Sequence, residues 1–173
     1  KDGNAVSMTS TVEGPFGSHL MAGGFILNNE LTDFSMLPEL NGRKIANRVE
    51  PNKRPMSSMT PTIIFKDKNL FALTGSPGGT SIINYVTKSV LGLIDWSLDP
   101  SEVTELPHYM NRGNYTELEK NTVLENLETE LKSLGHPIKI QNKRSGLHIA
   151  LKKDNGYIGA ADPRREGLVI PIN

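Results

Sequence analysis

Apolar residues alternate with polar ones in some segments and form short runs in others, and both patterns predict strands. Residues 5–12 alternate between an apolar face and a face of small or hydroxyl side chains, which is typical of a half-buried strand. The apolar run 25–27 predicts a second short strand. Residues 62–65 and 70–74 are apolar on both faces and flank the polar turn 66–69, so they predict a hairpin that is covered on both sides.

Helical spacing replaces alternation after this hairpin. A glycine-rich turn, 75–80, precedes apolar residues at intervals of three and four, which predict a helix; these are Ile82, Ile83, Val86, Val90, Leu91 and Ile94. The sequence 99–102, Asp-Pro-Ser-Glu, is a helix start with Asp at the cap and Pro at the first position. An apolar stripe over 116–134, followed by Gly135, predicts a third helix.

The last part of the chain again shows strand patterns, and these complete the evidence for the fold class. Residues 136–141, 147–151 and 157–161 read as strands, the last two joined by a turn. Strands, then helices, then strands predict one α+β domain over 1–173 with a mostly antiparallel sheet. The polar, aperiodic stretch 35–51 is predicted to be a lid-like surface loop, since long loops in compact domains often cover binding sites.

Composition narrows the possible functions. Lys plus Arg and Asp plus Glu are both 19, so the net charge is zero and does not favour a polyanionic partner such as nucleic acid. No apolar run approaches the roughly 18 residues of a membrane span. Cysteine is absent, which excludes disulfides, thiolate ligands and a cysteine nucleophile. The histidines His19, His108, His136 and His148 are scattered, so no metal site and no cofactor is expected.

Two candidate sites follow the predicted strands. The glycine turn 75–80 could present backbone N–H groups to an anion or a developing oxyanion, or it could simply be a tight turn. Glu30 and Asp33 could bind an ammonium group or a metal, or they could be solvated loop acids. Together with adjacent serine hydroxyls, which could hold a carboxylate, the acids would suit a zwitterionic ligand, and the backbone N–H groups of the turn would suit a developing oxyanion.

Two further features, the adjacent serines at 57–58 and the charged residues at 162–165, each have two possible interpretations. Ser57 and Ser58 could hold a carboxylate without carrying charge, or they could satisfy backbone groups at a turn. Neither lies in a Gly-x-Ser-x-Gly elbow, so a serine-hydrolase nucleophile is not expected. The sequence 162–165, Asp-Pro-Arg-Arg, is either a solvated charge run or an ion pair that supports a site.

Six motifs in order give the chain a resemblance to a known family. They are D-G-N-A-V-S at 2–7, F-G-S at 16–18, L-N-N-E-L-T-D-F at 27–34, N-K-R-P-M-S-S-M-T-P-T at 52–62, G-S-P-G-G at 75–79 and G-A-A-D-P-R at 159–164. The chain resembles the small, C-terminal subunit of the γ-glutamyltransferase (γ-glutamyltranspeptidase) family over essentially its full length.

The resemblance implies a fold, a reaction and a partner. The fold would be the small-subunit half of the four-layer αββα sandwich of N-terminal-nucleophile hydrolases. A precursor would cleave itself into a large and a small subunit, and the new N-terminal threonine would attack γ-glutamyl compounds such as glutathione. The acyl group would then pass to water, an amino acid or a dipeptide. That threonine is expected a few residues before Lys1, outside the given chain.

The resemblance also implies roles for substrate-binding residues. Ser57 and Ser58 match the pair that holds the α-carboxylate of the γ-glutamyl group. Glu30 and Asp33 match the positions that hold its α-amino group. Glu13 falls where well-known members carry asparagine, and it would contact the same amino group.

The remaining implied roles are catalytic. Gly78 and Gly79 match the backbone donors of the oxyanion hole, and Thr11 matches the threonine whose hydroxyl supports the nucleophile. The family's compartments, the periplasm, the outside of the cell or its surface, are the expected location. The chain could instead be part of a related acylase, a poly-γ-glutamate-processing enzyme or a catalytically inactive binding homologue. Glu30 and Asp33 argue against a glutaryl-type acylase, whose substrate has no α-amino group.

Overall fold

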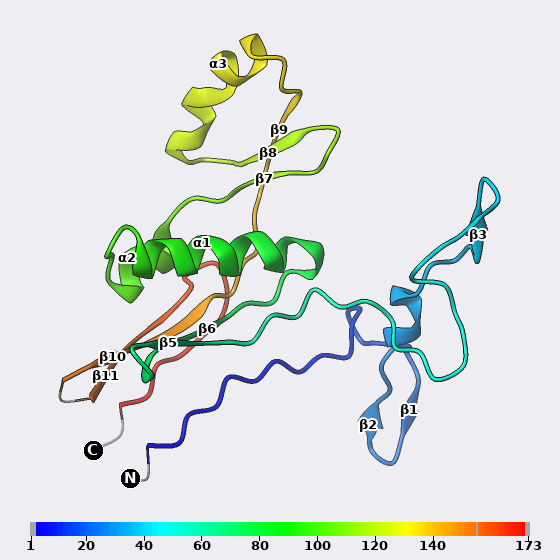
Figure 1. The fold of residues 1–173 in the computed structure, drawn as a ribbon, viewed down its shortest axis with the longest axis horizontal. Coiled ribbons are helices and arrows are strands. Elements are labelled where there is room, and N and C mark those ends of the chain that lie inside the picture. The colour runs from blue at the N-terminus through cyan, green and yellow to red at the C-terminus, as the bar shows by residue number, and fades with distance from the viewer. Residues whose placement is uncertain (1–2, 155, 172–173) are drawn as a thin grey trace. The chain divides into compact units, whose positions relative to one another are not determined.

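The chain forms two compact units in the computed structural model, which describes residues 3–154 and 156–171 (Figure 1). One unit is Ser10–Ser57, and the other combines the residues up to Thr9 with those from Ser58 onward. Helices and sheets occur together, as expected for the α+β class. Within the described residues, no helix is long and apolar enough to cross a membrane.

A four-stranded antiparallel sheet forms the base of the larger unit. Its strands are β5 (Thr62–Lys66), β6 (Asn69–Gly75), β10 (His148–Lys153) and β11 (Gly156–Ala161), in the order β11-β10-β6-β5. The predicted hairpin is confirmed, although its turn is shorter than predicted. Asp67 and Lys68 both have positive φ, which matches the twist of a two-residue hairpin turn.

Two helices cover one face of this sheet (Figure 1). They are α1 (Ile82–Ile94) and α2 (Pro100–Glu105). The helix start predicted at Asp99 is confirmed, and Asp99 and Glu102 form a capping box there. The core between helices and sheet contains Ala72, Leu93, Val103, Ile149 and Leu151. Alternate strand residues point into this core, which explains the period of two along β6 and β10.

The other face of the sheet is not covered as the sequence predicted. Ile63 and Phe65 of β5 are 39% and 63% exposed, although both were expected to be buried. The predicted strand over 5–12 is also absent. Val6 and Met8 are exposed there, and the segment pairs with no described strand, although the Ser7 hydroxyl donates to the Thr74 carbonyl oxygen at 3.3 Å. An alternating pattern forms a strand only when a neighbouring strand supplies its hydrogen bonds.

A second sheet includes the first four residues of the helix predicted over 116–134, and helical structure is confined to 123–133. Strand β8 (Thr116–Glu119) lies between β7 (Tyr109–Asn111), which is antiparallel to it, and β9 (Ile138–Gln141), which is parallel. The segment that follows is a 3₁₀ helix, η3 (Val123–Leu127), continued by α3 (Glu128–Ser133). The helix prediction was wrong for 116–119 because long-range strand pairing outweighed local spacing.

The smaller unit has little regular structure. It contains the hairpins β1 (Met21–Ala22) with β2 (Phe25–Ile26), and β3 (Glu39–Leu40) with β4 (Arg43–Lys44). Between them lies the 3₁₀ helix η1 (Glu30–Asp33). The stretch predicted as a lid-like loop thus contains its own hairpin, and a bridge between Ser35 and Arg48 closes it at the base.

Candidate functional site

Helix η1 presents the two acids that the sequence singled out. Glu30 and Asp33 lie three residues apart, which is one turn of a 3₁₀ helix, so both carboxylates emerge on the same side. Asn28 starts the turn, because its Oδ1 accepts the N–H of Glu30 at 3.0 Å. The smaller unit therefore brings these two predicted residues together.

Glu13 joins the same group from the preceding loop. Its backbone has φ of 72°, and its N–H donates to Thr11 Oγ1 at 2.8 Å. Its carboxylate accepts from the Asn29 side chain, whose Oδ1 in turn accepts from the Gly14 N–H at 2.9 Å. Asn29 thus fixes the Glu13 carboxylate beside η1, and sequence reasoning gave Asn29 no role.

The electrostatics of Glu30 reflect this crowding. Burial raises the pKa of the Glu30 carboxyl above its ordinary value, and the nearby charges of Asp33 and Glu13 raise it further. Glu30 Oε1 is buried and has no hydrogen-bond partner among the described residues. A carboxylate oxygen in this condition would be stabilised by a cation, because an unpaired buried acceptor carries a desolvation cost.

Asn47 connects η1 to the segment that leads to the serine pair. Its Nδ2 donates to the Asp33 carbonyl oxygen at 2.6 Å, and its Oδ1 accepts from the Met56 N–H at 3.0 Å. Ser57 directly follows Met56 and ends the smaller unit, whereas Ser58 begins the larger one. The Ser58 carbonyl oxygen accepts from Thr60 Oγ1 at 2.8 Å.

The glycine turn lies in the larger unit, between β6 and α1. Gly78 has φ of 140° and precedes the 3₁₀ turn η2 (Gly79–Ser81), which runs into α1. A Cβ atom added to Gly78 would lie 2.7 Å from the Tyr85 ring. Only glycine fits here, since the backbone conformation and the ring both exclude a side chain. The backbone N–H groups of Gly78 and Gly79 thus sit at the start of a helical segment, where anions are favoured.

A chain of buried polar groups extends inward from this turn. The Tyr85 ring packs on the His108 ring with centroids 4.2 Å apart. His108 Nε2 lies 2.7 Å from Ser145 Oγ, which donates to Asp162 Oδ2 at 2.5 Å. Because the Ser145 proton is used toward Asp162, Ser145 accepts from His108, which places the imidazole proton on Nε2.

The charges of this buried chain are strongly shifted. Burial lowers the pKa of His108 to about 2, and the charges of Lys88 and Arg164 act in the same direction. Burial alone would raise the pKa of Asp162, but hydrogen bonds from Ser145 and the Arg164 backbone, together with the Arg164 charge, lower it. His108 is therefore a neutral packing residue, in line with the scattered histidines of the sequence.

Arg164 decides between the two interpretations of the terminal charge run. Its Nε lies 2.6 Å from Glu119 Oε1, and its Nη1 lies 3.1 Å from Asp162 Oδ1. Its Nη1 also donates to the Thr104 carbonyl oxygen at 2.9 Å. Asp162 and Arg164 are thus an ion pair inside the larger unit, not a solvated run. Spacing could not reveal this, because Glu119 lies 45 residues away.

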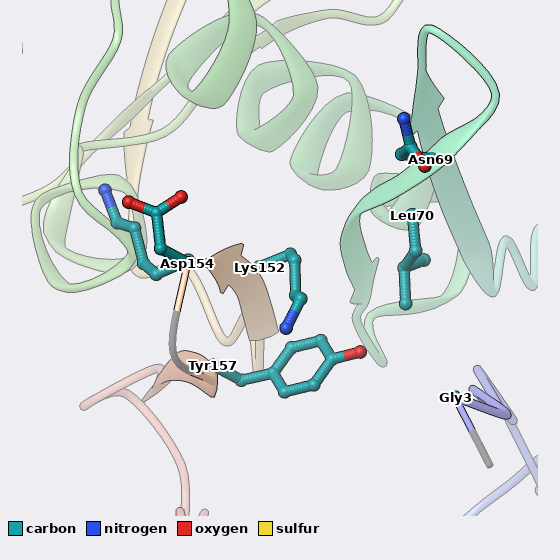
Figure 2. A pocket seen from close by; sticks show the side chains of 7 residues that line it. Gly3, Asn69, Leu70, Lys152, Asp154 and Tyr157 are labelled. Carbon is teal, nitrogen blue, oxygen red and sulfur yellow. The ribbon is translucent and has the colours of Figure 1, made fainter.

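A pocket of the larger unit lies away from these residues (Figure 2). It lies at the turns of the β5–β6 and β10–β11 hairpins, where Lys152 Nζ lies 4.8 Å from the centre of the Tyr157 ring. None of the predicted site residues lines it. Among the described parts of the chain, no cluster of three or more His, Asp or Glu residues has the arrangement of a metal site.

The predicted site residues therefore fall into two sets. Thr11, Glu13, Glu30 and Asp33 gather in the smaller unit, with Ser57 at its end. The other set, Ser58, Gly78 and Gly79, belongs to the larger unit. Their assignment as one site remains a prediction.

Comparison with known proteins identifies relatives over nearly the whole chain. The sequence model of the gamma-glutamyltranspeptidase family matches residues 1–172. The chain is 40% identical over 179 residues to the glutathione hydrolase proenzyme of Bacillus subtilis strain 168, covering 99% of this chain and 29% of that protein. The corresponding protein of Escherichia coli K12 is 38% identical over 174 residues, covering 95% and 30%. The chain thus spans 29% and 30% of the lengths of these relatives.

A solved structure resembles this chain in both fold and sequence. A mutant of Helicobacter pylori gamma-glutamyltranspeptidase superposes with a TM-score of 0.82 and 35% sequence identity, covering 94% of this chain and 95% of that one. This similarity confirms the predicted fold, the small-subunit half of an N-terminal-nucleophile hydrolase.

Proposed function

The chain belongs to the gamma-glutamyltranspeptidase family, and from this premise we propose that it is the small-subunit part of an enzyme that cleaves γ-glutamyl amides such as glutathione. The N-terminal threonine of the mature subunit attacks the γ-carbonyl carbon, with its own α-amino group as base, and the amine leaves. Water, an amino acid or a dipeptide then attacks the γ-glutamyl-threonine ester and releases the enzyme.

The observation that carries this proposal is the acid cluster on η1. Glu30 Oε1 is buried without a hydrogen-bond partner among the described residues, and Asp33 and Glu13 add negative charge beside it. The α-ammonium group of a γ-glutamyl donor would supply the missing hydrogen bond and offset the like-charge repulsion. A donor without this ammonium, such as a glutaryl amide, would leave the cluster uncompensated.

The other groups act at the α-carboxylate of the donor and at the oxyanion that forms during its cleavage. Ser57 and Ser58 hold its α-carboxylate with hydroxyl donors. The N–H groups of Gly78 and Gly79 stabilise the oxyanion that forms on the γ-carbonyl oxygen, and the fixed backbone of the turn supports this role. Thr11 supports the nucleophile through its hydroxyl.

The mature enzyme contains a second subunit in this proposal. The similar proteins of Bacillus subtilis and Escherichia coli are named proenzymes, which supports a precursor that is cleaved into a large and a small subunit. The large subunit covers the exposed apolar face of β5 and completes the substrate site. The periplasm, the cell surface or the outside of the cell is the proposed location, in keeping with the family resemblance.

The test begins with intact mass measurement and N-terminal sequencing of the small subunit from the full-length protein. We expect threonine at its N-terminus and cleavage of a γ-glutamyl anilide, faster in the presence of a dipeptide acceptor. A terminal residue without hydroxyl or thiol would indicate a catalytically inactive homologue. A threonine enzyme that hydrolyses only glutaryl amides would indicate a related acylase, and one that acts only on poly-γ-glutamate would indicate a polymer-processing enzyme.

A further inference from the structure

One side chain of the smaller unit links the two segments that carry its candidate ammonium and carboxylate subsites. Asp33 lies at the end of η1, and Ser57 lies 24 positions later at the end of the unit. A zwitterionic donor presents its ammonium and carboxylate groups on one carbon atom, so the groups that hold them must keep a fixed separation. Some contact must therefore bind the chain after η1 to the chain before Ser57.

Asn47 makes this contact on both sides. Its Nδ2 donates to the Asp33 carbonyl oxygen at 2.6 Å, and its Oδ1 accepts from the Met56 N–H at 3.0 Å. Its own carbonyl oxygen accepts from the Ser35 N–H at 2.8 Å. One residue thus makes two hydrogen bonds to the segment at and after Asp33, and one to the residue directly before Ser57.

The residues around Asn47 keep it in place. Lys53 Nζ donates to the Ala46 carbonyl oxygen at 2.6 Å and lies 3.0 Å from Glu50 Oε2. Arg48 donates to the Ile45 carbonyl oxygen at 2.9 Å and also pairs with Glu50. These bonds cross-link 45–53, so the Asn47 side chain extends from a turn that several side chains brace.

We propose that Asn47 is a positioning residue that fixes the Asp33 backbone relative to Ser57, and thereby the spacing between the ammonium and carboxylate subsites. The inference rests on the proposed function and extends it to a residue that contacts neither end of the donor. The inference also changes the role expected for the predicted lid-like loop, 35–51. Its last part, together with 52–53, would hold the two subsites at a fixed distance and would not move as a lid.

The test compares Asn47→Ala and Asn47→Asp in the full-length enzyme with wild type, using a γ-glutamyl anilide as donor and L-glutamate as competitor. We expect Asn47→Ala to raise KM and the inhibition constant of L-glutamate at least tenfold, with kcat changed less than threefold. Asn47→Asp keeps the acceptor for the Met56 N–H but cannot donate to the Asp33 carbonyl oxygen, so it should leave KM at least fivefold raised.

The matched control is Asn111→Ala. Asn111 also makes one donor and one acceptor bond, to Thr116 Oγ1 at 3.2 Å and from the Gly113 N–H at 2.7 Å, but in the β7–β8 hairpin. The KM of Asn111→Ala should stay within twofold of the wild-type value. Thermal melting of every variant shows whether it is folded. Equal KM changes in Asn47→Ala and Asn111→Ala, or full recovery by Asn47→Asp, would overturn the positioning role.

The result for wild type separates this inference from the proposed function. Wild-type enzyme without γ-glutamyl turnover would overturn both. Active wild-type enzyme with unchanged KM in Asn47→Ala would overturn the role of Asn47 alone. If Asn47→Ala does not fold, the isosteric Asn47→Asp decides the outcome by the same KM criterion.

Discussion

At the scale of single residues, the smaller unit keeps charges together at a cost in stability. Glu30 lies beside Asp33 and Glu13, and its pKa is raised by burial and by both neighbours. An acid with a raised pKa in the folded state favours folding less as pH rises from about 4.5 through the folded pKa, because the unfolded chain releases the proton more easily. Substrate-binding groups commonly carry such a cost, since ligand binding recovers it.

Replacing Glu30 should make the folded enzyme more stable at neutral pH but weaken its binding of the γ-glutamyl donor. Glu30→Gln in the full-length enzyme should raise Tm at pH 7 but leave it nearly unchanged at pH 4, where wild-type Glu30 is largely protonated in both states. KM for a γ-glutamyl anilide should rise at least tenfold, because an amide offers the ammonium no charge. Melting curves at both pH values and steady-state kinetics measure this.

The exposed acid Glu39 of β3 serves as the control for Glu30. Glu39→Gln should change neither Tm nor KM measurably. A loss of stability at pH 7 in Glu30→Gln would contradict the interpretation of the cluster as an uncompensated charge.

Gly78 offers a second prediction at this scale. Gly78→Ala should destabilise the enzyme by roughly 1–3 kcal/mol, because alanine rarely adopts φ of 140° and its Cβ would meet the Tyr85 ring. Gly79→Ala is the matched comparison, since its φ of 57° is less restrictive and nothing lies within 4 Å of the added Cβ. Thermal melts of both variants measure the difference, and equal losses would argue against a role for the Tyr85 ring.

At the scale of elements, the strand β8 is held by charges as well as by pairing. Glu117 is buried and pairs with Lys143 and with Arg112, whose Nε lies 3.2 Å away. Burial raises the pKa of Glu117, but the hydrogen bonds from Lys143 and Arg112 outweigh it and lower the pKa overall. The same Arg112 reaches Ser81 at the start of α1, so the second sheet is tied to the helix behind the glycine turn.

Breaking this pair should destabilise the larger unit. Glu117→Gln should cost about 3–5 kcal/mol at neutral pH, because it leaves the buried Lys143 uncompensated. In wild type, a lowered folded pKa means that the stabilisation is present above about pH 4.5 and is lost as pH falls through the folded pKa. Urea titrations between pH 7 and pH 3 should show this loss in wild type and a smaller one in the variant.

The surface pair Glu128–Lys132 is the control for this element. Glu128→Gln removes an exposed i,i+4 pair of 2.7 Å and should cost less than about 1 kcal/mol. A cost for Glu117→Gln as small as this would show that the buried pair contributes little to the second sheet.

At the scale of the whole molecule, much apolar surface stays exposed on this chain. Ile63 and Phe65 on β5, and Leu168 and Ile170 near the end, are examples. A large exposed apolar surface usually marks a protein interface. The proposed large subunit would cover it, and a sheet predicted to be buried on both faces would then be so only in the assembled enzyme.

Expression of residues 1–173 alone tests this dependence. The isolated chain should be poorly soluble or melt without a cooperative transition, because the apolar face is bare. Co-expression with the rest of the precursor should restore a monodisperse, cooperatively melting protein, as followed by size-exclusion chromatography and thermal melting. A monodisperse isolated chain with a sharp transition would count against an obligate partner.

Local signals in the sequence determined those features that depend on neighbouring residues. The hairpin around Asp67, the capping box at Asp99 and the glycine turn before α1 follow from backbone preferences of a few residues, and the structure contains all three. The six ordered motifs were sufficient to identify the family. The sequence also singled out Glu30 and Asp33 together, but the 3₁₀ turn that places both acids on one side was not predicted.

Tertiary structure decided whatever depends on partners distant in sequence. Residues 116–119 became a strand because β7 and β9 supply its hydrogen bonds, and residues 5–12 did not, because no described strand pairs with them. Arg164 lies half-buried in the larger unit because Glu119 and Asp162 compensate its charge. Asn47 contacts Asp33 and Met56 only because the folded chain brings these two residues, one before and one after it in the sequence, next to its side chain. Polar and charged groups in a low-dielectric interior stabilise the fold only when each has a partner. The fold alone determines which groups obtain one.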